Sequence, residues 1–165
     1  MEKDYISAYE YEKNVNPDLT NIPFYEKNIN DCNYGINIID FSNVFNIAYK
    51  STTPNLLASF IKLTKNDTIE LNNTQFNEFN ATSHLFYIIN GKASIHVNDN
   101  DEQFVFSGDI LINPCFSAVK IKNLGEDELQ IYYINDSPLV NYLGSRAEKR
   151  IFKFIMKLYK HFYIL

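Results

Sequence analysis

The chain of 165 residues contains no tryptophan and only two cysteines, Cys32 and Cys115. Two cysteines cannot build the disulfide framework that is typical of small secreted proteins. No apolar run approaches the ~20 residues needed to span a bilayer, and the charged N-terminus MEKDYISAYEYEKN lacks the apolar core of a signal peptide. These absences predict a cytoplasmic protein in which Cys115 is a buried, unreactive thiol.

Charge is distributed unevenly along the chain. Residues 146–165 hold six of the 15 Lys and Arg residues and a single acid, Glu148, whereas the first 145 residues carry a net charge of −10. An acidic body repels nucleic acid, so only the tail could attract an anionic partner. The sequence therefore predicts that neither nucleic acid nor a membrane is a partner of this protein.

The predicted secondary structure changes near residue 54, from short helices to short β-strands. Upstream, a short helix is predicted at 2–13, and the stretch DFSNVFNIAY offers Ser42 as the N-cap of another. Downstream, short β-rich runs alternate with turn signals, which is typical of an antiparallel sandwich or barrel. We therefore predict an all-β fold in three segments: an irregular, partly helical extension over 1–53, a barrel over 54–144, and a tail over 145–165.

The tail RAEKRIFKFIMKLYKHFYIL has helical periodicity. Its apolar stripe is formed by Ile151, Ile155, Leu158, Phe162 and Leu165, and its basic stripe by Lys149, Lys153, Lys157 and Lys160. Because an apolar stripe usually faces a core, we predict a C-terminal amphipathic helix that packs on the barrel or on a second subunit. A helix that lies on a membrane surface or binds another partner is the alternative.

The Asn90-Gly91 dipeptide predicts a two-residue hairpin turn that pairs Ile89 with Lys92. In that register Phe86 pairs with Ile95, and residues that pair share a face. One face is then almost entirely apolar and consists of His84, Phe86, Ile88, Ala93, Ile95 and Val97. His84 and His96 point to opposite faces and cannot share a metal, and the third histidine, His161, lies in the tail. No two-histidine site is therefore predicted.

Three stretches resemble the cupin superfamily of small jelly-roll barrels: HLFYIINGKASIHV, FSGDILINP and IYYINDSPLVNYLG. The last is similar to a strand end in the gentisate and hydroxynaphthoate dioxygenase group, whose members are bicupins that use non-haem iron to open aromatic rings. The resemblance covers roughly residues 54–144. It implies a single cupin-type jelly-roll β-barrel, with short helices before it and the amphipathic helix after it.

The first metal motif of the family has two histidines and a glutamate before a glycine. Counted back from Gly91, these places hold Glu78, Asn80 and His84. In the second motif Gly108, Pro114 and Asn123 fit, but the histidine place is Val119. The resemblance thus implies that the turns of the barrel are kept while the iron ligands are not.

Glu78, Asn80 and His84 share strand parity, so we predict that all three face the barrel interior. With Tyr87 and Val119 they form the predicted ligand-binding set, which orients a small organic molecule without a metal or other cofactor. The alternative is that Glu78 and His84 bind Fe2+ or another divalent metal, and that Tyr87 donates a proton in an isomerase-like reaction.

Three functions stay open at the level of sequence. The first is a metal-free cupin that binds a small organic ligand or acts as the non-catalytic partner of another cupin. The second is a metal-dependent dioxygenase-like or isomerase-like enzyme. The third is a structural dimerisation module. The partners that these functions imply are a small molecule and either a second copy of the chain, as a homodimer, or a second cupin chain.

Overall fold

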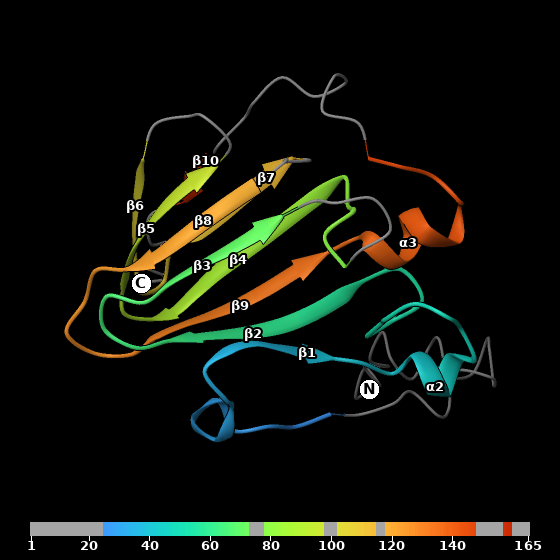
Figure 1. Ribbon diagram of the computed structural model, residues 1–165, viewed down its shortest axis with the longest axis horizontal. Coiled ribbons are helices and arrows are strands. Elements are labelled where there is room, and N and C mark those ends of the chain that lie inside the picture. Colours follow the sequence, from blue (N-terminus) through green and yellow to red (C-terminus); the bar gives the residue numbers. More distant parts are fainter. Residues whose placement is uncertain (1–24, 73–77, 98–101, 115–117, 148–156, 160–165) are drawn as a thin grey trace, which may run out of the picture.

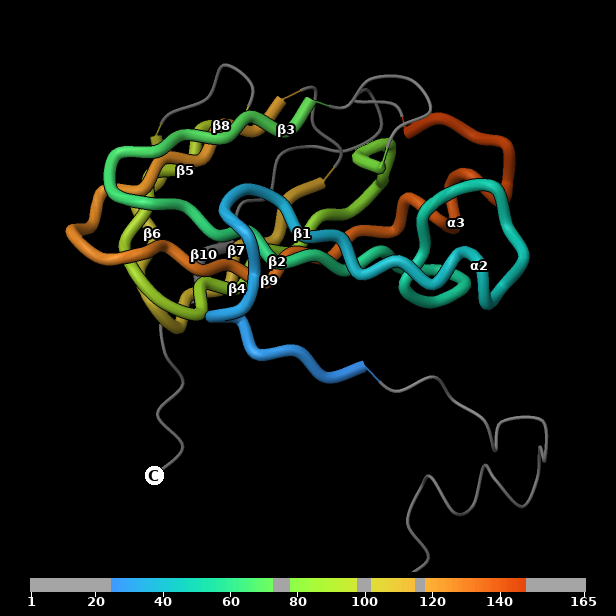
Figure 2. Tube along the Cα trace, turned by 60° about the horizontal axis from the view of Figure 1, so that its bottom comes forward, coloured from blue at the N-terminus to red at the C-terminus, as the bar shows by residue number. Residues whose placement is uncertain are grey.

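The computed structural model describes residues 25–72, 78–97, 102–114 and 118–147, and the backbone of 157–159. The described strands form two antiparallel sheets that stack face to face (Figure 1 and Figure 2). The predicted all-β jelly roll is therefore confirmed.

The larger sheet has six strands in the order β1-β2-β9-β4-β7-β10. Their bounds are Gly35–Ile39 for β1, Leu57–Leu63 for β2, Leu129–Asn135 for β9, Ser83–Asn90 for β4, Ile110–Pro114 for β7 and Lys157–Tyr159 for β10. The smaller sheet has four strands in the order β3-β8-β5-β6. Their bounds are Thr68–Asn72 for β3, Ala118–Asn123 for β8, Lys92–Val97 for β5 and Gln103–Phe106 for β6.

Alternation along each strand sends every second side chain into the space between the sheets. In β4, Phe86 and Ile88 are fully buried, whereas Tyr87 between them is exposed. The interior side chains of both sheets form one hydrophobic cluster: Ile61, Leu63, Leu71, Phe86, Ile88, Ala93, Ile95, Val97, Val105, Leu111, Val119, Ile121, Leu129, Ile131 and Tyr133. Burial of this cluster is the main favourable term in folding.

The register predicted for the Asn90-Gly91 turn is wrong, although the faces that it predicted are right. β4 ends at Asn90 in the six-stranded sheet and β5 begins at Lys92 in the four-stranded sheet, so the turn crosses the barrel and joins no hairpin. Gly91 permits this corner because its φ of 98° lies in the left-handed region that favours glycine. His84 points inward and His96 lies on the outer face of the sheet. The other predicted interior residues are fully buried: Phe86, Ile88, Ala93, Ile95 and Val97.

The segment predicted to be irregular contains strand β1, which pairs along its whole length with β2. It also contains the 3-10 helix η2 (Ile29–Asp31) and the helix α2 (Ser42–Phe45). Ser42 begins α2 and is not its N-cap: the cap position is Phe41, and the Ser42 N–H donates to Oδ1 of Asp40. The helix predicted at 2–13 lies outside the described residues. The division of the chain at residues 54 and 145 stays a prediction.

The predicted C-terminal helix lies almost wholly outside the described residues. Cys115, predicted to be a buried thiol, also lies outside them. For Lys157–Tyr159 the prediction is wrong, because these residues form β10, which pairs with β7. β10 is thus the edge strand of the six-stranded sheet, and it bonds the backbone groups of β7 that face away from β4. A six-residue helix, α3 (Ser137–Tyr142), follows β9. No described helix has the length and apolar character that crossing a membrane requires.

Candidate functional site

One end of the barrel carries a row of buried polar side chains on the inner face of the six-stranded sheet. His84, near the start of β4, lies opposite Asn113 of β7 on one side and Asn135 of β9 on the other. Residues that face each other across antiparallel strands point to the same side of a sheet. All three are buried, with exposures of 0% for His84 and Asn113 and 2% for Asn135. We call this region the His84 end.

His84 is paired with a tyrosine from the next row. Its Nδ1 lies 2.7 Å from the hydroxyl of Tyr133, and the ring of Tyr133 stacks on Phe86 with centroids 4.6 Å apart. Burial lowers the pKa of His84 to about 3, and burial also raises the pKa of Tyr133 far above its ordinary value. Both side chains are therefore uncharged at neutral pH, and the pair is a polar but neutral surface inside an apolar core.

The two asparagines that flank His84 differ in their hydrogen bonds. Asn135 is satisfied, because its Nδ2 donates to the Glu78 carbonyl at 3.0 Å and its Oδ1 accepts from the Ser137 N–H at 2.9 Å. Asn113 has no hydrogen-bond partner among the described residues for either its Nδ2 or its Oδ1. A buried amide without partners is rare in folded proteins and calls for an explanation, such as a bound molecule or a water.

Glu78 and Asn80 do not join His84 in the interior. β4 begins only at Ser83, so the strand parity assumed for residues 78–84 does not extend back to them. Asn80 is buried and ties the loop to the chain after α3, donating to the Ser145 carbonyl and accepting from the Ala147 N–H. The structure therefore does not bring the three polar residues of the predicted set together.

The Glu78 carboxylate points to the N-terminal part of the chain. It lies 2.6 Å from the Lys50 ammonium, and this hydrogen bond lowers the pKa of Glu78. Both side chains are partly exposed. The arrangement is that of a partly exposed ion pair, in which the partner of the carboxylate is Lys50.

The remaining two predicted residues lie apart from each other. Tyr87 is on the outer face of the six-stranded sheet, where it lines a shallow hollow of about 430 Å3 with Phe60 and Tyr132. Val119 is on the inner face of β8, fully buried between Leu71 and Val97 on the neighbouring strands. Among the five predicted residues, only His84 and Val119 face the interior between the sheets.

Tyr133 and Asn113 are the site residues that the sequence alone did not indicate. Tyr132 and Tyr133 are neighbours in β9 and point to opposite faces, and the hydroxyl of the inward one, Tyr133, reaches His84. Asn113 sits two residues after the buried Leu111 in β7, so alternation along the strand could have placed it inside. A polar residue at an inward position of a predicted strand was therefore the signal that could have indicated Asn113 as a site residue.

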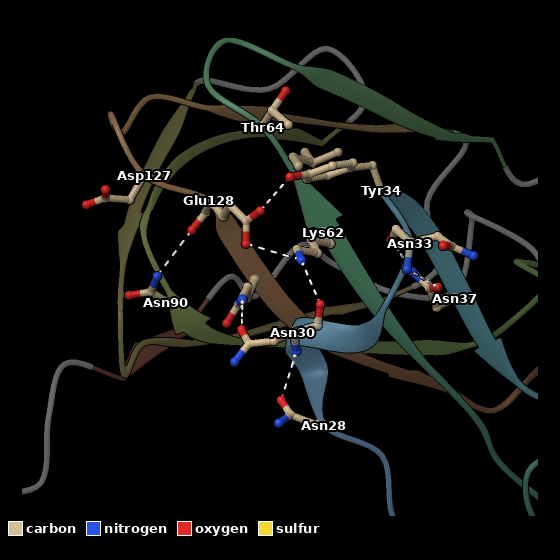
Figure 3. Close-up of polar contacts among 12 residues, drawn as sticks. Asn28, Asn30, Asn33, Tyr34, Asn37, Lys62, Thr64, Asn90, Asp127 and Glu128 are labelled. Carbon is tan, nitrogen blue, oxygen red and sulfur yellow. Dashed lines mark hydrogen bonds and ion pairs between the residues drawn. The ribbon is translucent and has the colours of Figure 1, made fainter.

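The opposite end of the barrel is held by a different polar cluster (Figure 3). The buried ammonium of Lys62 lies 3.2 Å from the Glu128 carboxylate and donates to the Asn30 carbonyl. The Tyr34 hydroxyl donates to Glu128 at 2.6 Å, and this bond, with Lys62, lowers the pKa of Glu128. The cluster fastens residues 28–37 to the sheet, and each of these polar groups has a partner within the protein.

A polar hollow of about 490 Å3 lies on the outer face of the four-stranded sheet. His96 and Glu102 form a contact of 3.3 Å there, and Lys120 lies between Glu70 and His96 on adjacent strands. Opposite charges thus face one another on a half-exposed surface, which is ordinary for a solvated sheet face. Within the described residues, no three His, Cys, Asp or Glu side chains come close enough to hold a metal ion.

No family model matches the sequence, and no curated protein matches it either. The fold, in contrast, is similar to solved structures. An RmlC-like cupin family protein with a double-stranded β-helix fold from Methanocaldococcus jannaschii is 15% identical, with a TM-score of 0.55, and the match covers 75% of this chain and 97% of that one. The cupin domain of Cnp3 from Schizosaccharomyces pombe is 16% identical, with a TM-score of 0.52, and the match covers 76% and 78%.

A salicylate 1,2-dioxygenase from Pseudoaminobacter salicylatoxidans is also similar, at 16% identity and a TM-score of 0.48. That match covers 75% of this chain but 29% of the enzyme. The fold is established by the likeness to the Methanocaldococcus jannaschii and Schizosaccharomyces pombe structures, and identities this low establish no activity. The resemblance to the cupin superfamily that the sequence suggested is therefore confirmed as a cupin fold.

Proposed function

We propose that this cupin barrel binds a small organic molecule at its His84 end and uses no metal to do so. The observation that carries the proposal is the buried, uncharged row of His84 and Asn113, with the Tyr133 hydroxyl beside it. A few polar groups set among apolar and aromatic side chains are the usual chemistry of a small-molecule site. The core on this side has Phe86 against Tyr133, which supplies the apolar part.

The metal that many cupins hold does not fit the residues present at the corresponding positions. A catalytic zinc or iron needs about three protein ligands and an open position. Glu78 is paired with Lys50, the oxygen of Asn80 accepts from a backbone N–H, and Val119 has no donor atom. His84 alone supplies one ligand, which falls short of the three that such a site needs. This donor set supports a metal-free protein over a dioxygenase-like or isomerase-like enzyme.

Elemental analysis tests the metal-free state directly. Protein purified without chelators or affinity metal should contain far less than one equivalent of iron, zinc or manganese per chain. About one equivalent that is lost in the His84→Ala variant, and retained in a His96→Ala control on the outer face, would overturn the proposal and favour the enzyme.

Native mass spectrometry and a small-molecule fragment screen by NMR test the binding itself. We expect fragments to perturb the signals of His84 and Tyr133 and to leave His96 unchanged. His84→Ala should weaken such binding, whereas His96→Ala should not. A screen in which no fragment perturbs the His84 end, together with protein that carries no co-purified molecule, would contradict small-molecule binding.

A second candidate function, association with another cupin chain, has an observation of its own. The outer face of the six-stranded sheet carries an apolar row across β7, β4 and β9, formed by Ile112, Leu85 and Ile134. Ile112 and the nearby Leu56 are more than 40% exposed, and both line a groove of about 320 Å3 that also reaches His84 and Asn135. Exposed apolar surface of this kind is typical of protein interfaces.

We propose that a second copy of the chain covers this face. Sedimentation velocity should detect a dimer that Ile112→Lys dissociates, because a lysine in a closed apolar interface loses its hydration. Phe104→Lys, on an exposed position of the other sheet, is the matched control and should leave the dimer intact. A wild-type protein that stays monomeric at every concentration would exclude this function without affecting ligand binding.

A further inference from the structure

The described part of the chain contains four buried asparagines, with exposures between 0% and 2%. Three of them use both ends of the amide: Asn80, Asn123 and Asn135 each donate through Nδ2 and accept through Oδ1. Asn113 is the exception within the described residues, since neither its Nδ2 nor its Oδ1 has a partner. Its amide therefore keeps a complete donor and acceptor pair for a molecule that is not part of the chain.

Two observations indicate that the Asn113 amide faces the interior. It shares the buried parity of Leu111 in β7, and the residue directly opposite on β4 is His84. The row below contains Leu111 and Phe86, which are both fully buried. The amide thus borders an apolar core on one side and the neutral His84–Tyr133 pair on the other.

We propose that Asn113 selects the ligand of the barrel, and that this ligand is a neutral molecule with an adjacent N–H donor and C=O acceptor, such as a primary carboxamide or a lactam. The inference rests on small-molecule binding at the His84 end. An asparagine amide can bond such an edge in two parallel hydrogen bonds, as it does with the edge of a nucleobase. Both atoms of the amide are then satisfied by one ligand group.

Charge excludes the ionised analogues of the same shape. A carboxylate placed beside Asn113 would lose its hydration. Of the described neighbours named above, none offers a positive charge, because His84 is neutral and Leu111 and Phe86 are apolar. A carboxylate also has no donor for the Asn113 Oδ1. Benzamide and benzoate differ in these two respects and hardly in shape, so they form a matched pair of probes.

The experiment measures the binding of benzamide and benzoate to the full chain by NMR and by thermal shift. In protein labelled with 15N, benzamide should move the side-chain NH2 signal of Asn113 and leave that of Asn123 unchanged. Benzoate should move neither. Asn113→Leu should weaken the binding of benzamide about tenfold or more, and Asn113→Ser serves as the second variant if the leucine does not fold.

Each outcome decides the inference. A benzamide shift that is specific to Asn113 and lost in the variants supports it. If both probes bind at the His84 end with equal affinity, or if Asn113→Leu binds benzamide as the wild type does, Asn113 is not the selecting group although the barrel still binds small molecules. An Asn113 NH2 signal that no carboxamide moves, while other fragments perturb His84 and Tyr133, overturns the inference in the same way. A failure of every fragment to bind overturns the proposed function with it.

Discussion

Asn123 and Asn113 are both fully buried strand residues, yet they lie toward opposite ends of the barrel, where β8 and β7 finish (Figure 1). The Nδ2 of Asn123 lies 2.8–3.3 Å from three carbonyl oxygens, and its Oδ1 accepts from the Gly125 N–H at 2.8 Å. Asn113 has no such partner among the described residues. The chemistry of the two side chains is the same, so the difference comes from what surrounds them.

This difference separates the tasks of the two ends. Asn123 fastens the loops that close its end, and the Lys62–Glu128 cluster does the same for the segment that leads into β1. Those hydrogen bonds stabilise the free protein. At the His84 end, the Asn113 amide is buried without a partner among the described residues, which costs stability unless something else binds there. Proteins commonly accept such a cost at the sites where they function.

The largest expected difference in stability is the one between the leucine variants of these two asparagines. Asn123→Leu leaves three carbonyl oxygens and one N–H without their bonds, and we expect a loss of about 3–5 kcal/mol in the free energy of unfolding. Asn113→Leu removes an amide that has no partner in the described residues, so it should be neutral or stabilise by about 1 kcal/mol.

Urea unfolding at pH 7 measures both variants. Equal losses of stability in the two would show that Asn113 is held by bonds of its own, and the contrast between the ends would disappear. A rise in stability for Asn113→Leu combined with loss of ligand binding would strengthen the contrast between an end that stabilises the protein and an end that binds a ligand.

Gly91 sits at the corner of the end that Asn123 closes and should show the next largest effect. Its φ is 98°, and an added Cβ would lie 3.1 Å from the Glu128 carbonyl oxygen and from Leu129 Cα. Gly91→Ala therefore combines backbone strain with a clash against backbone atoms, and we expect it to cost about 2–3 kcal/mol. Gly35 is a matched control, since its φ is 93° but an added Cβ meets nothing within 4 Å.

Thermal and urea unfolding of both glycine variants separate strain from clash. Gly35→Ala should cost about 1 kcal/mol from strain alone. If Gly91→Ala costs no more than Gly35→Ala, the corner is not tightly packed, and the closed end is looser than its hydrogen bonds suggest.

His84 should make the opposite end sensitive to pH. Burial lowers its pKa in the folded state to about 3, whereas an unfolded histidine titrates near 6.5. The unfolded state therefore binds a proton at a higher pH than the folded state does. The stability that His84 contributes is fully present above pH 6.5 and is lost as the pH falls toward 3. Between pH 7 and pH 5 the loss should be about 2 kcal/mol.

Urea unfolding at a series of pH values checks this expectation. His84→Gln should flatten the profile between pH 7 and pH 5, because glutamine does not titrate. His96→Gln, on the outer face, should leave the slope unchanged. A wild-type profile without a slope in this range would mean that His84 can take up a proton while folded, and the neutral site would be disproved.

The fold was largely predictable because it follows from local signals. Alternation placed Phe86, Ile88, Ala93 and Ile95 in the interior whether or not their strands pair with each other. The same signals could not distinguish a hairpin from a corner between sheets, since the Asn90-Gly91 turn suits both. β1 was missed because GINII is short and its partner β2 follows only after α2.

The site was less predictable, because strand parity holds only within a strand. Glu78 and Asn80 precede β4, so their spacing from His84 did not determine where they point. Asn80 then bonds to backbone far along the chain, at Ser145 and Ala147, and no sequence pattern indicates such a contact. The absence of partners at Asn113 is likewise a property of the packed structure.

The smallest expected effect belongs to Glu78, and it tests whether this carboxylate belongs to the His84 end. Glu78 and Lys50 form a partly exposed ion pair, and such pairs contribute about 0–1 kcal/mol. Glu78→Gln should therefore lower the free energy of unfolding by less than about 1 kcal/mol and leave the affinity for fragments at the His84 end unchanged. Lys50→Gln is the matched control, because it breaks the same pair from the other side. Urea unfolding and the NMR fragment screen measure both variants. If Glu78→Gln weakens ligand binding strongly while Lys50→Gln does not, the carboxylate turns inward to meet the ligand, and the polar set predicted from the sequence would be restored.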